Sequence, residues 1–220
     1  MTIAIDRTTT PLDVPSAILQ RRAIKTFKPD PIPPELLHQL IELTVAAPSS
    51  FNLQEWRIIL VQDEEQKKAL AAASWNQQQI IQAPVTFVFA AEPFLPDADL
   101  SPILDQAMAN GAWNEATVNY FRDAIPKFQT AIGDKRREYA IKDAMIAATH
   151  TALAAESLGL SSCFMNGWIE DQVKAVIGAG NNLAIALLLP IGYAAEPRKH
   201  PGRLPLSANV FVDRVGHSYS

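Results

Sequence analysis

The sequence predicts an α+β fold, and two observations lead to this prediction. Segments with helical spacing are mixed with short β-rich segments, but without the strict strand–helix repeat of a doubly wound parallel sheet. The motifs GxGxxG after a strand and GxxxxGK[S/T], which mark dinucleotide-binding and P-loop folds, are missing. No long linker divides the chain. We therefore expect a single domain over residues 1–220, with helices packed on a sheet.

The N-terminal region is expected to be mainly helical. Residues 1–12 resemble a loose leader, and a short helix is predicted over residues 13–22. Leucines at helical spacing predict a second helix that opens at Pro33-Pro34 and ends at Pro48, because proline cannot continue a helix.

Two strands and two short helices follow. The composition of RIILVQ (57–62) and VTFVFAA (85–91) predicts strands, the second of them buried. An Asp followed three residues later by a Gln resembles a capping box and predicts a helix over residues 63–73. A second short helix is expected over residues 76–82.

The C-terminal half contains one irregular region and one long tail. Residues 93–133 show helical stretches that we expect to be interrupted at Pro102, Gly111 and Pro126. Strands are predicted over 160–165 and 183–189, with a helix over 170–177 between them. Residues 194–220 have little core of their own and are expected to wrap another surface.

The longest predicted helix covers residues 134–158 and ends at Gly159. Its stretch AMIAATHTALAA is small and apolar on nearly every side, and a helix without a polar face must be buried. A subunit interface is a natural place for it. We expect His150, on this helix, to be a core histidine with its hydrogen bonds satisfied.

Composition excludes several classes of function. The net charge is −4 and basic clusters are absent, which argues against nucleic-acid binding. The single cysteine, Cys163, excludes an intrachain disulfide and a multi-cysteine zinc site and favours a reducing, cytoplasmic location; in its strand-like setting we expect it to be buried and unreactive. The histidines lack metal-ligand spacing, and the longest apolar run, residues 183–192, is too short to cross a membrane. A chain without a nucleophile, acid pair or metal cluster often relies on a cofactor.

Three segments carry polar residues that suggest a binding site. They are QRRAIKTF (20–27), APSSFNLQEW (47–56) and HPGRLP (200–205). Each has a plain structural explanation on its own: cations at the C-terminal end of a helix, a turn that satisfies its own backbone, and an arginine on a proline-stiffened turn.

Together, the segments resemble those of the nitroreductase family, flavoproteins that hold FMN without a Rossmann site. The matching stretches are RRAIKTF, APSSFNLQEW, WNQQQIIQAP, SSCFMNGW, IGYAAEP and RLPL, in the family's order from residue 21 to residue 206. The resemblance implies a nitroreductase-like α+β fold: a mixed sheet flanked by helices in an intertwined homodimer. FMN would lie at the interface and contact both subunits.

The resemblance also implies which residues hold the cofactor. They are Arg21, Arg22, Ala23, Lys25, Pro48, Ser49, Ser50, Asn52, Asn76, Gln79, Met165, Asn166, Gly167, Gly202 and Arg203. Arg21 and Arg203 would clamp the phosphate, with Arg22 along the ribityl chain or phosphate. Lys25 would lie at the pyrimidine edge, where a cation stabilises the reduced flavin.

The remaining cofactor contacts fall into three groups. Asn76 and Gln79 would also lie at the pyrimidine edge, and the backbone of residues 165–167 would pass flavin N5. Ser49, Ser50 and Asn52 would reach the flavin of the partner subunit.

Four features depart from the family pattern. Lys25 stands where many members have arginine, which still leaves a cation, and the segment 164–167 lacks the acidic residue that some members have before the glycine. Ala23 replaces the usual serine and loses a hydroxyl contact. Glu55 replaces the usual proline and places an uncompensated carboxylate beside the loop, which would alter the loop's rigidity or the potential around the flavin.

Aromatic residues of the 93–133 region are candidate substrate contacts, because this excursion corresponds to the segment that covers the flavin in the family. Trp113, Tyr120, Phe121 and Phe128 could stack on a bound nitroaromatic, quinone or nicotinamide. The alternative is that they form the core of the excursion's own helices.

The implied activity is ping-pong electron transfer from NADH or NADPH, through FMN, to a small electron-poor acceptor such as a nitroaromatic or a quinone. It needs no catalytic side chain and no metal. One alternative is a flavin-binding protein for storage, delivery or breakdown of flavin. Another is a dimeric interaction protein that has lost the cofactor, although three retained cations argue against it.

Overall fold

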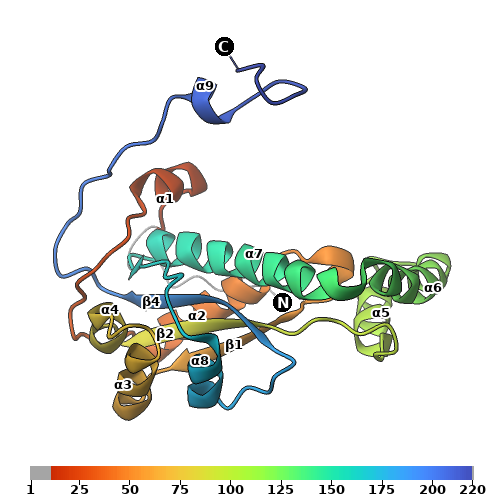
Figure 1. The fold of residues 1–220 in the computed structure, drawn as a ribbon, viewed down its shortest axis with the longest axis horizontal. Coiled ribbons are helices and arrows are strands. Elements are labelled where there is room, and N and C mark those ends of the chain that lie inside the picture. Colours follow the sequence, from red (N-terminus) through yellow and green to blue (C-terminus); the bar gives the residue numbers. More distant parts are fainter. Residues whose placement is uncertain (1–10, 220) are drawn as a thin grey trace.

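The computed structural model of the chain describes residues 11–219. Its elements, in chain order, are α1 (Val14–Gln20), α2 (Pro34–Val45), the 3₁₀ turn η1 (Ser50–Asn52), β1 (Trp56–Val61), α3 (Glu64–Ala72), α4 (Gln78–Gln82), β2 (Val85–Ala91), α5 (Ser101–Ala109), α6 (Glu115–Ile132), η2 (Gly133–Lys135), α7 (Arg136–Ser157), β3 (Ser161–Ser162), α8 (Glu170–Ile177), β4 (Ala184–Gly192) and α9 (Leu206–Asn209). Helices cover both faces of a central sheet (Figure 1).

The four strands form one sheet in the order β1-β2-β4-β3, with every neighbouring pair antiparallel. A single parallel bridge joins Ala23 to Ser162, so the N-terminal segment lies along the β3 edge. This arrangement confirms the α+β prediction and explains why no strand–helix repeat is visible in the sequence.

Alternate residues of β2 face two different helical layers. Phe87 and Phe89 pack in one buried cluster with α2 and α7. Val88 and Ala90 pack in another with apolar residues of α3, α4 and α8. Because successive side chains of a strand point to opposite faces, a continuously apolar β2 requires a cover on both sides of the sheet, and the structure provides it.

Most predicted elements occur within one or two residues of their expected bounds, but four expectations are corrected. Pro126 does not interrupt the excursion; it lies inside α6. The strand expected over 160–165 is reduced to the two-residue β3 and a bridge at Met165, while β4 continues beyond residue 189 through Pro190 to Gly192. His150 is exposed rather than in the core, because α7 turns its alanine stripe to the sheet and His150 lies on the opposite side.

Two parts of the chain extend from the helix–sheet body. The excursion forms α5 and α6, which close a third cluster around Leu53, Leu104 and Ile125. Residues 195–219 form an arm that stands away from the body, and every residue of it is exposed (Figure 1). The leader expected over residues 1–12 lies, as far as residue 10, outside the described residues; Leu12 is tied to α7 through Ser157.

Two properties of the described residues bear on function, namely membrane-spanning helices and clusters of metal ligands. Among the helices of the described part, none combines the length and apolarity that a bilayer crossing requires. Within residues 11–219, no three His, Cys, Asp or Glu side chains come together as a metal site.

Candidate functional site

The segment that carries Lys25 is fixed against the strand edge around Cys163. The amide of Ile24 donates to the carbonyl of Ser162 at 3.1 Å, next to the Ala23–Ser162 bridge. The Lys25 ammonium donates to Cys163 Sγ at 3.3 Å. Cys163 is fully buried, as expected, and it holds the Lys25 ammonium beside the segment that follows β3.

The loop before α4 contacts the same segment from another side. Gln77 Nε2 donates to the carbonyl oxygen of Gly167 at 3.1 Å, and Gln79 Nε2 donates to Gln77 Oε1 at 3.1 Å. Met165 is paired with Leu188 of β4 through both its amide and its carbonyl. The cofactor residues predicted around residues 25, 76–79 and 165–167 therefore share one region, although they come from three distant parts of the chain.

Gly167 allows a close approach in this region. A Cβ at this position would lie 2.5 Å from Cζ3 of Trp75. Trp75 and Asn76 both have left-handed backbone conformations, with φ of 56° and 53°, which turn the loop toward Gly167 and leave the Asn76 side chain exposed. Gly167 therefore allows the Trp75 ring and the loop before α4 to pack directly on the backbone that follows β3.

The predicted phosphate clamp consists of cations from both ends of the chain. Burial slightly lowers the pKa of His200, and the charges of Arg203, Arg22 and Arg21 lower this pKa further, so the three guanidinium groups lie within electrostatic reach of His200. Gly202 provides the carbonyl that Arg203 Nη1 contacts at 2.7 Å. The geometry fits an anion site that the surrounding cations would stabilise.

Two observations describe the arginines in more detail. The Arg21 guanidinium lies 5.8 Å from the ring centroid of Phe164. Arg22 donates through Nη1 to three carbonyls of its own helix end, while its buried Nε has no partner among the described residues. An unsatisfied buried donor next to other cations can donate to an oxygen atom of an anionic ligand.

The residues predicted to reach the flavin of the partner subunit lie elsewhere in the same chain. Ser50 donates to Asp143 of α7 through its amide at 3.0 Å and through Oγ at 3.3 Å. Arg21 and Arg22, in contrast, act on Glu156, whose pKa is raised by burial and lowered by these arginines. Asp143 and Glu156 are between three and four helical turns apart, or about 20 Å along α7.

Pro48, Ser49, Ser50 and Asn52 are therefore grouped at one end of α7, and the cation cluster at the other. One chain does not bring the two halves together. This separation is what a site shared between two subunits requires.

The aromatic residues of the excursion pack largely against one another. Trp113 and Phe121 have ring centroids 4.7 Å apart and adjoin the third core cluster. This environment agrees with the alternative interpretation, in which these aromatic residues form the core of the excursion's own helices. Tyr120 is 66% exposed and is the candidate most accessible to a ligand.

Sequence reasoning missed several residues of this region. Gln77 and His200 contact or face predicted cofactor residues, and Asp143 holds the loop that carries Ser50. The signal for Gln77 was present, since it lies in the same WNQQQ stretch as Asn76 and Gln79. Asp143 gave a weaker signal: it is a lone carboxylate within an otherwise apolar helix face.

Comparisons with known proteins identify the class to which this fold and site belong. The model of the nitroreductase family matches residues 18–193. This chain belongs to the nitroreductase family.

Individual relatives can be aligned with this chain over nearly the full length of both proteins. A Thermus thermophilus protein named NADH dehydrogenase is 35% identical over 200 residues, covering 90% of this chain and 95% of the relative. YodC of Bacillus subtilis, whose name describes an NAD(P)H nitroreductase, is 28% identical and covers 90% of this chain and 96% of its own. A nitroreductase structure from Exiguobacterium sibiricum, solved in complex with FMN, has a TM-score of 0.83 at 25% identity, covering 91% of this chain and 97% of that one.

Proposed function

We propose that this protein is an FMN-dependent oxidoreductase that takes hydride from NADH or NADPH and reduces nitroaromatics, quinones or similar electron-poor acceptors by a ping-pong mechanism. The observation that carries the proposal is that the Lys25, Gln77 and Gly167 segments meet around Cys163, with the Arg21 guanidinium 5.8 Å from the Phe164 ring, at positions that match the family's cofactor motifs. The FMN-bound relative and the names of the NAD(P)H nitroreductases support it.

The residues present fit FMN in three respects. The guanidinium groups, with the unpartnered Nε of Arg22, suit a phosphate. Lys25 supplies a cation, and Asn76 supplies an exposed amide for the pyrimidine edge. Gly167 lets the loop that carries Asn76 pack closely on the backbone of residues 165–167, which would bring the two predicted flavin contacts together.

The chain's own part in the reaction is to position and to stabilise charge. Bound FMN would supply the redox chemistry, accepting hydride from the nicotinamide and returning two electrons to the acceptor. Lys25, held by Cys163, would keep a positive charge next to the pyrimidine edge. The excursion at 93–133 would cover the substrate side, with Trp113, Tyr120 and Phe121 as candidate substrate contacts. The proposal includes a cytoplasmic location, since a lone cysteine fits a reducing compartment.

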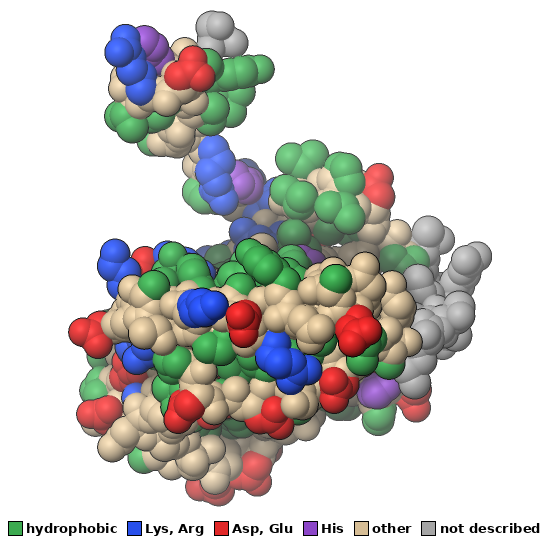
Figure 2. All heavy atoms as spheres, turned by 90° about the vertical axis from the view of Figure 1, so that its right-hand side faces the viewer, with side chains coloured by type: hydrophobic (Ala, Val, Ile, Leu, Met, Phe, Trp, Pro, Cys, Tyr) green, Lys and Arg blue, Asp and Glu red, His purple; other side chains and the backbone are tan. Residues whose placement is uncertain are grey.

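The proposal also includes a homodimer in which residues 194–220 of each chain wrap the partner. The arm exposes large apolar side chains, among them Leu204, Leu206, Phe211 and Val215. Figure 2 shows that hydrophobic side chains gather on this projecting part. A single domain of this kind rarely exposes so much apolar surface unless another chain covers it. A second copy would also bring the Ser49–Asn52 turn to the cation cluster.

The decisive experiment is a visible spectrum of the purified, FMN-loaded protein, followed by rapid mixing with NADH or NADPH without oxygen. A reductase is expected to lose its flavin absorbance within seconds and to recover it when a quinone is added. A protein that binds FMN but keeps its colour would be the flavin carrier. A colourless protein that does not take up FMN would contradict the proposal.

Replacing Lys25 with methionine is expected to make the reduction potential of bound FMN about 30–60 mV more negative. The reason is that one charged hydrogen bond to the reduced form contributes about 1.5–3 kcal/mol. The potential can be measured by equilibration with reference dyes. Lys28→Met, at an exposed lysine three residues away, is the matched control. An equal potential in both variants would exclude this role for Lys25.

A further inference from the structure

The turn that is predicted to reach the partner's flavin is held from two sides. On one side, Asp143 of α7 accepts both hydrogen bonds from Ser50. On the other side, Phe51 packs edge-on against Phe121 and Phe128 of α6, with ring centroids 5.8 and 5.2 Å apart. Leu53 is buried in the third core cluster with residues of α5 and α6. The turn can therefore move only if its contacts with α5 and α6 break, or if these two helices move with it.

Glu55 makes the polar link between the turn and the start of the excursion. Its main-chain carbonyl accepts the amide of Glu92 at 2.8 Å, and its Oε1 accepts the amide of Phe94 at 2.6 Å. The side chain is 2% exposed, and Oε2 has no partner among the described residues. Glu55 thus joins the two segments with one satisfied and one unsatisfied carboxyl oxygen.

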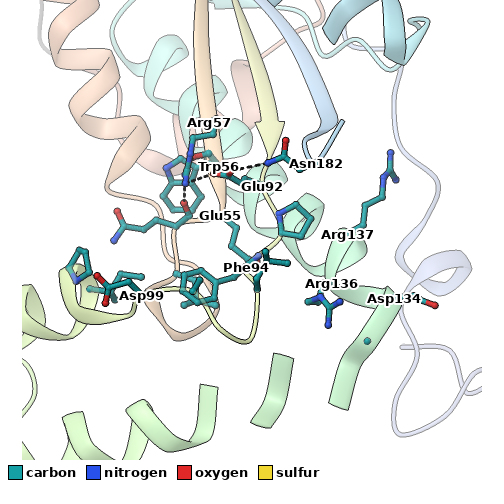
Figure 3. A pocket seen from close by; sticks show the side chains of 18 of the residues that line it. Glu55, Trp56, Arg57, Glu92, Phe94, Asp99, Asp134, Arg136, Arg137 and Asn182 are labelled. Atoms are coloured by element: carbon teal, nitrogen blue, oxygen red, sulfur yellow. Dashed lines mark hydrogen bonds and ion pairs between the residues drawn. The ribbon is translucent and has the colours of Figure 1, made fainter. Parts of the chain in front are cut away.

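Glu55 forms part of the wall of a cavity of about 930 Å³ between β1 and the excursion (Figure 3). The charged groups that line the cavity are Arg57 on β1, Glu92, Asp99, Asp134, Arg136 and Arg137, and Asp143 on α7 also acts on Glu55. The three cations are engaged elsewhere: Arg57 pairs with Glu92, Arg136 donates to the carbonyl of Gln129 at 2.9 Å, and Arg137 pairs with Glu170. Among the described residues, no cation pairs with the Glu55 carboxyl.

We propose that Glu55 is a positioning residue for the flavin site: its neutral carboxyl fastens the turn at residues 49–54 to the start of the excursion, and its ionisation releases the turn. This inference rests on the proposed function, because the target of the turn is the FMN of the partner subunit.

Burial raises the pKa of Glu55 to about 7; the Phe94 amide opposes this rise and the nearby charge of Asp143 adds to it. The side chain therefore changes its charge in the neutral range. An ionised carboxylate needs water or a cation, and Oε2 has neither among the described residues; ionisation therefore favours a state in which the turn and residues 92–94 separate enough to admit water from the cavity.

The turn itself is poised to move. The backbone φ values of Phe51, Asn52 and Gln54 are 50°, 57° and 51°. They fall in the left-handed region, which residues other than glycine rarely adopt. Such backbone conformations persist only while surrounding contacts hold them. Loss of the Glu55 link would remove one of these contacts and allow the turn to relax.

The test compares FMN affinity between pH 6 and pH 8 in three full-length proteins: wild type, Glu55→Gln and Glu115→Gln. Glu115 is an exposed glutamate on α6 of the same excursion and serves as the matched control. From pH 6 to pH 8, the dissociation constant of the wild type and of the control is expected to rise about tenfold more than that of Glu55→Gln. The titration of the FMN phosphate itself is common to all three and cancels.

A second readout needs no flavin and no variant. In the unloaded wild type, hydrogen exchange of the Phe94 amide is expected to accelerate about tenfold more from pH 6 to pH 8 than that of the Gln66 amide, which opens locally at the exposed start of α3, after correction for intrinsic exchange.

The outcomes separate the two proposals. If all three proteins bind FMN with one pH profile, or if the Phe94 and Gln66 amides respond equally to pH, the positioning role of Glu55 is overturned while the proposed function stands. If none binds FMN at any pH, the proposed function fails, and the exchange experiment alone decides whether Glu55 controls the turn.

Discussion

Replacing Arg21 or Arg203 with glutamine is expected to lower the affinity for FMN by about ten- to a hundredfold. Each guanidinium would make charged hydrogen bonds to the phosphate, and such a bond contributes about 1.5–3 kcal/mol. Glutamine keeps much of the side chain's length but carries no charge. Dissociation constants from fluorescence quenching of FMN, measured at one fixed ionic strength, provide the number.

Riboflavin distinguishes a phosphate clamp from a general loss of structure. It has the same ring system as FMN but no phosphate, so its weaker binding is expected to be nearly the same in wild type, Arg21→Gln and Arg203→Gln. Arg198→Gln, at another exposed position of the same arm, is expected to leave FMN binding unchanged. Equal losses for FMN and riboflavin would show that the arginines do not act on the phosphate.

The layers of the fold could be predicted from local patterns. Continuous apolar runs identified β2 and β4 as buried strands, and small apolar residues identified α7 as the helix that lies deepest against the sheet. The course of residues 93–133 could not be predicted in the same way. Pro126 indicates a break, but buried residues lie on both sides of it, Ile125 before and Gln129 after, and their packing keeps α6 continuous.

His150 shows a second limit of prediction from sequence: the buried face of a helix with little polar contrast cannot be identified. Composition alone could not tell which side of α7 faces the sheet, because alanine and threonine occur all around the helix. The buried face is decided by tertiary contacts, such as the hydrogen bond of 2.9 Å between Thr44 and Thr151. His150 therefore faces outward within this chain.

The candidate site was predictable only where residues follow one another in a recognisable motif. The motifs around Arg21, Ser50 and Gly167 indicated their segments, but not the groups that hold them. Cys163 under the Lys25 ammonium and Asp143 under Ser50 come from distant parts of the chain, more than 90 residues away in each case. Contacts of this kind depend on the complete fold, and a single sequence without the structure does not reveal them.

The buried carboxyl of Glu55 is expected to make the protein less stable as the pH rises. Its folded-state pKa of about 7 lies above the ordinary value of 4.5, so the folded protein holds this proton more tightly than the unfolded chain does. The free energy of unfolding is then highest at low pH and falls as the pH rises from about 4.5 to 7, with little further change above that range. Between pH 5 and pH 8, the loss from this one group is about 2–3 kcal/mol.

Urea unfolding at pH 5, 6, 7 and 8 measures this loss in wild type, Glu55→Gln and Glu115→Gln. Asp143 also has a pKa raised by burial, so part of the pH dependence remains in every variant. The difference between wild type and Glu55→Gln isolates Glu55, because glutamine keeps the amide acceptor for Phe94 but does not ionise. The relative stability of Glu55→Gln should therefore improve by about 2–3 kcal/mol from pH 5 to pH 8, whereas Glu115→Gln should follow the wild type. A constant difference between Glu55→Gln and wild type at all four pH values would mean that Glu55 is already ionised in the folded protein at pH 5, and that its carboxylate is solvated or paired in solution.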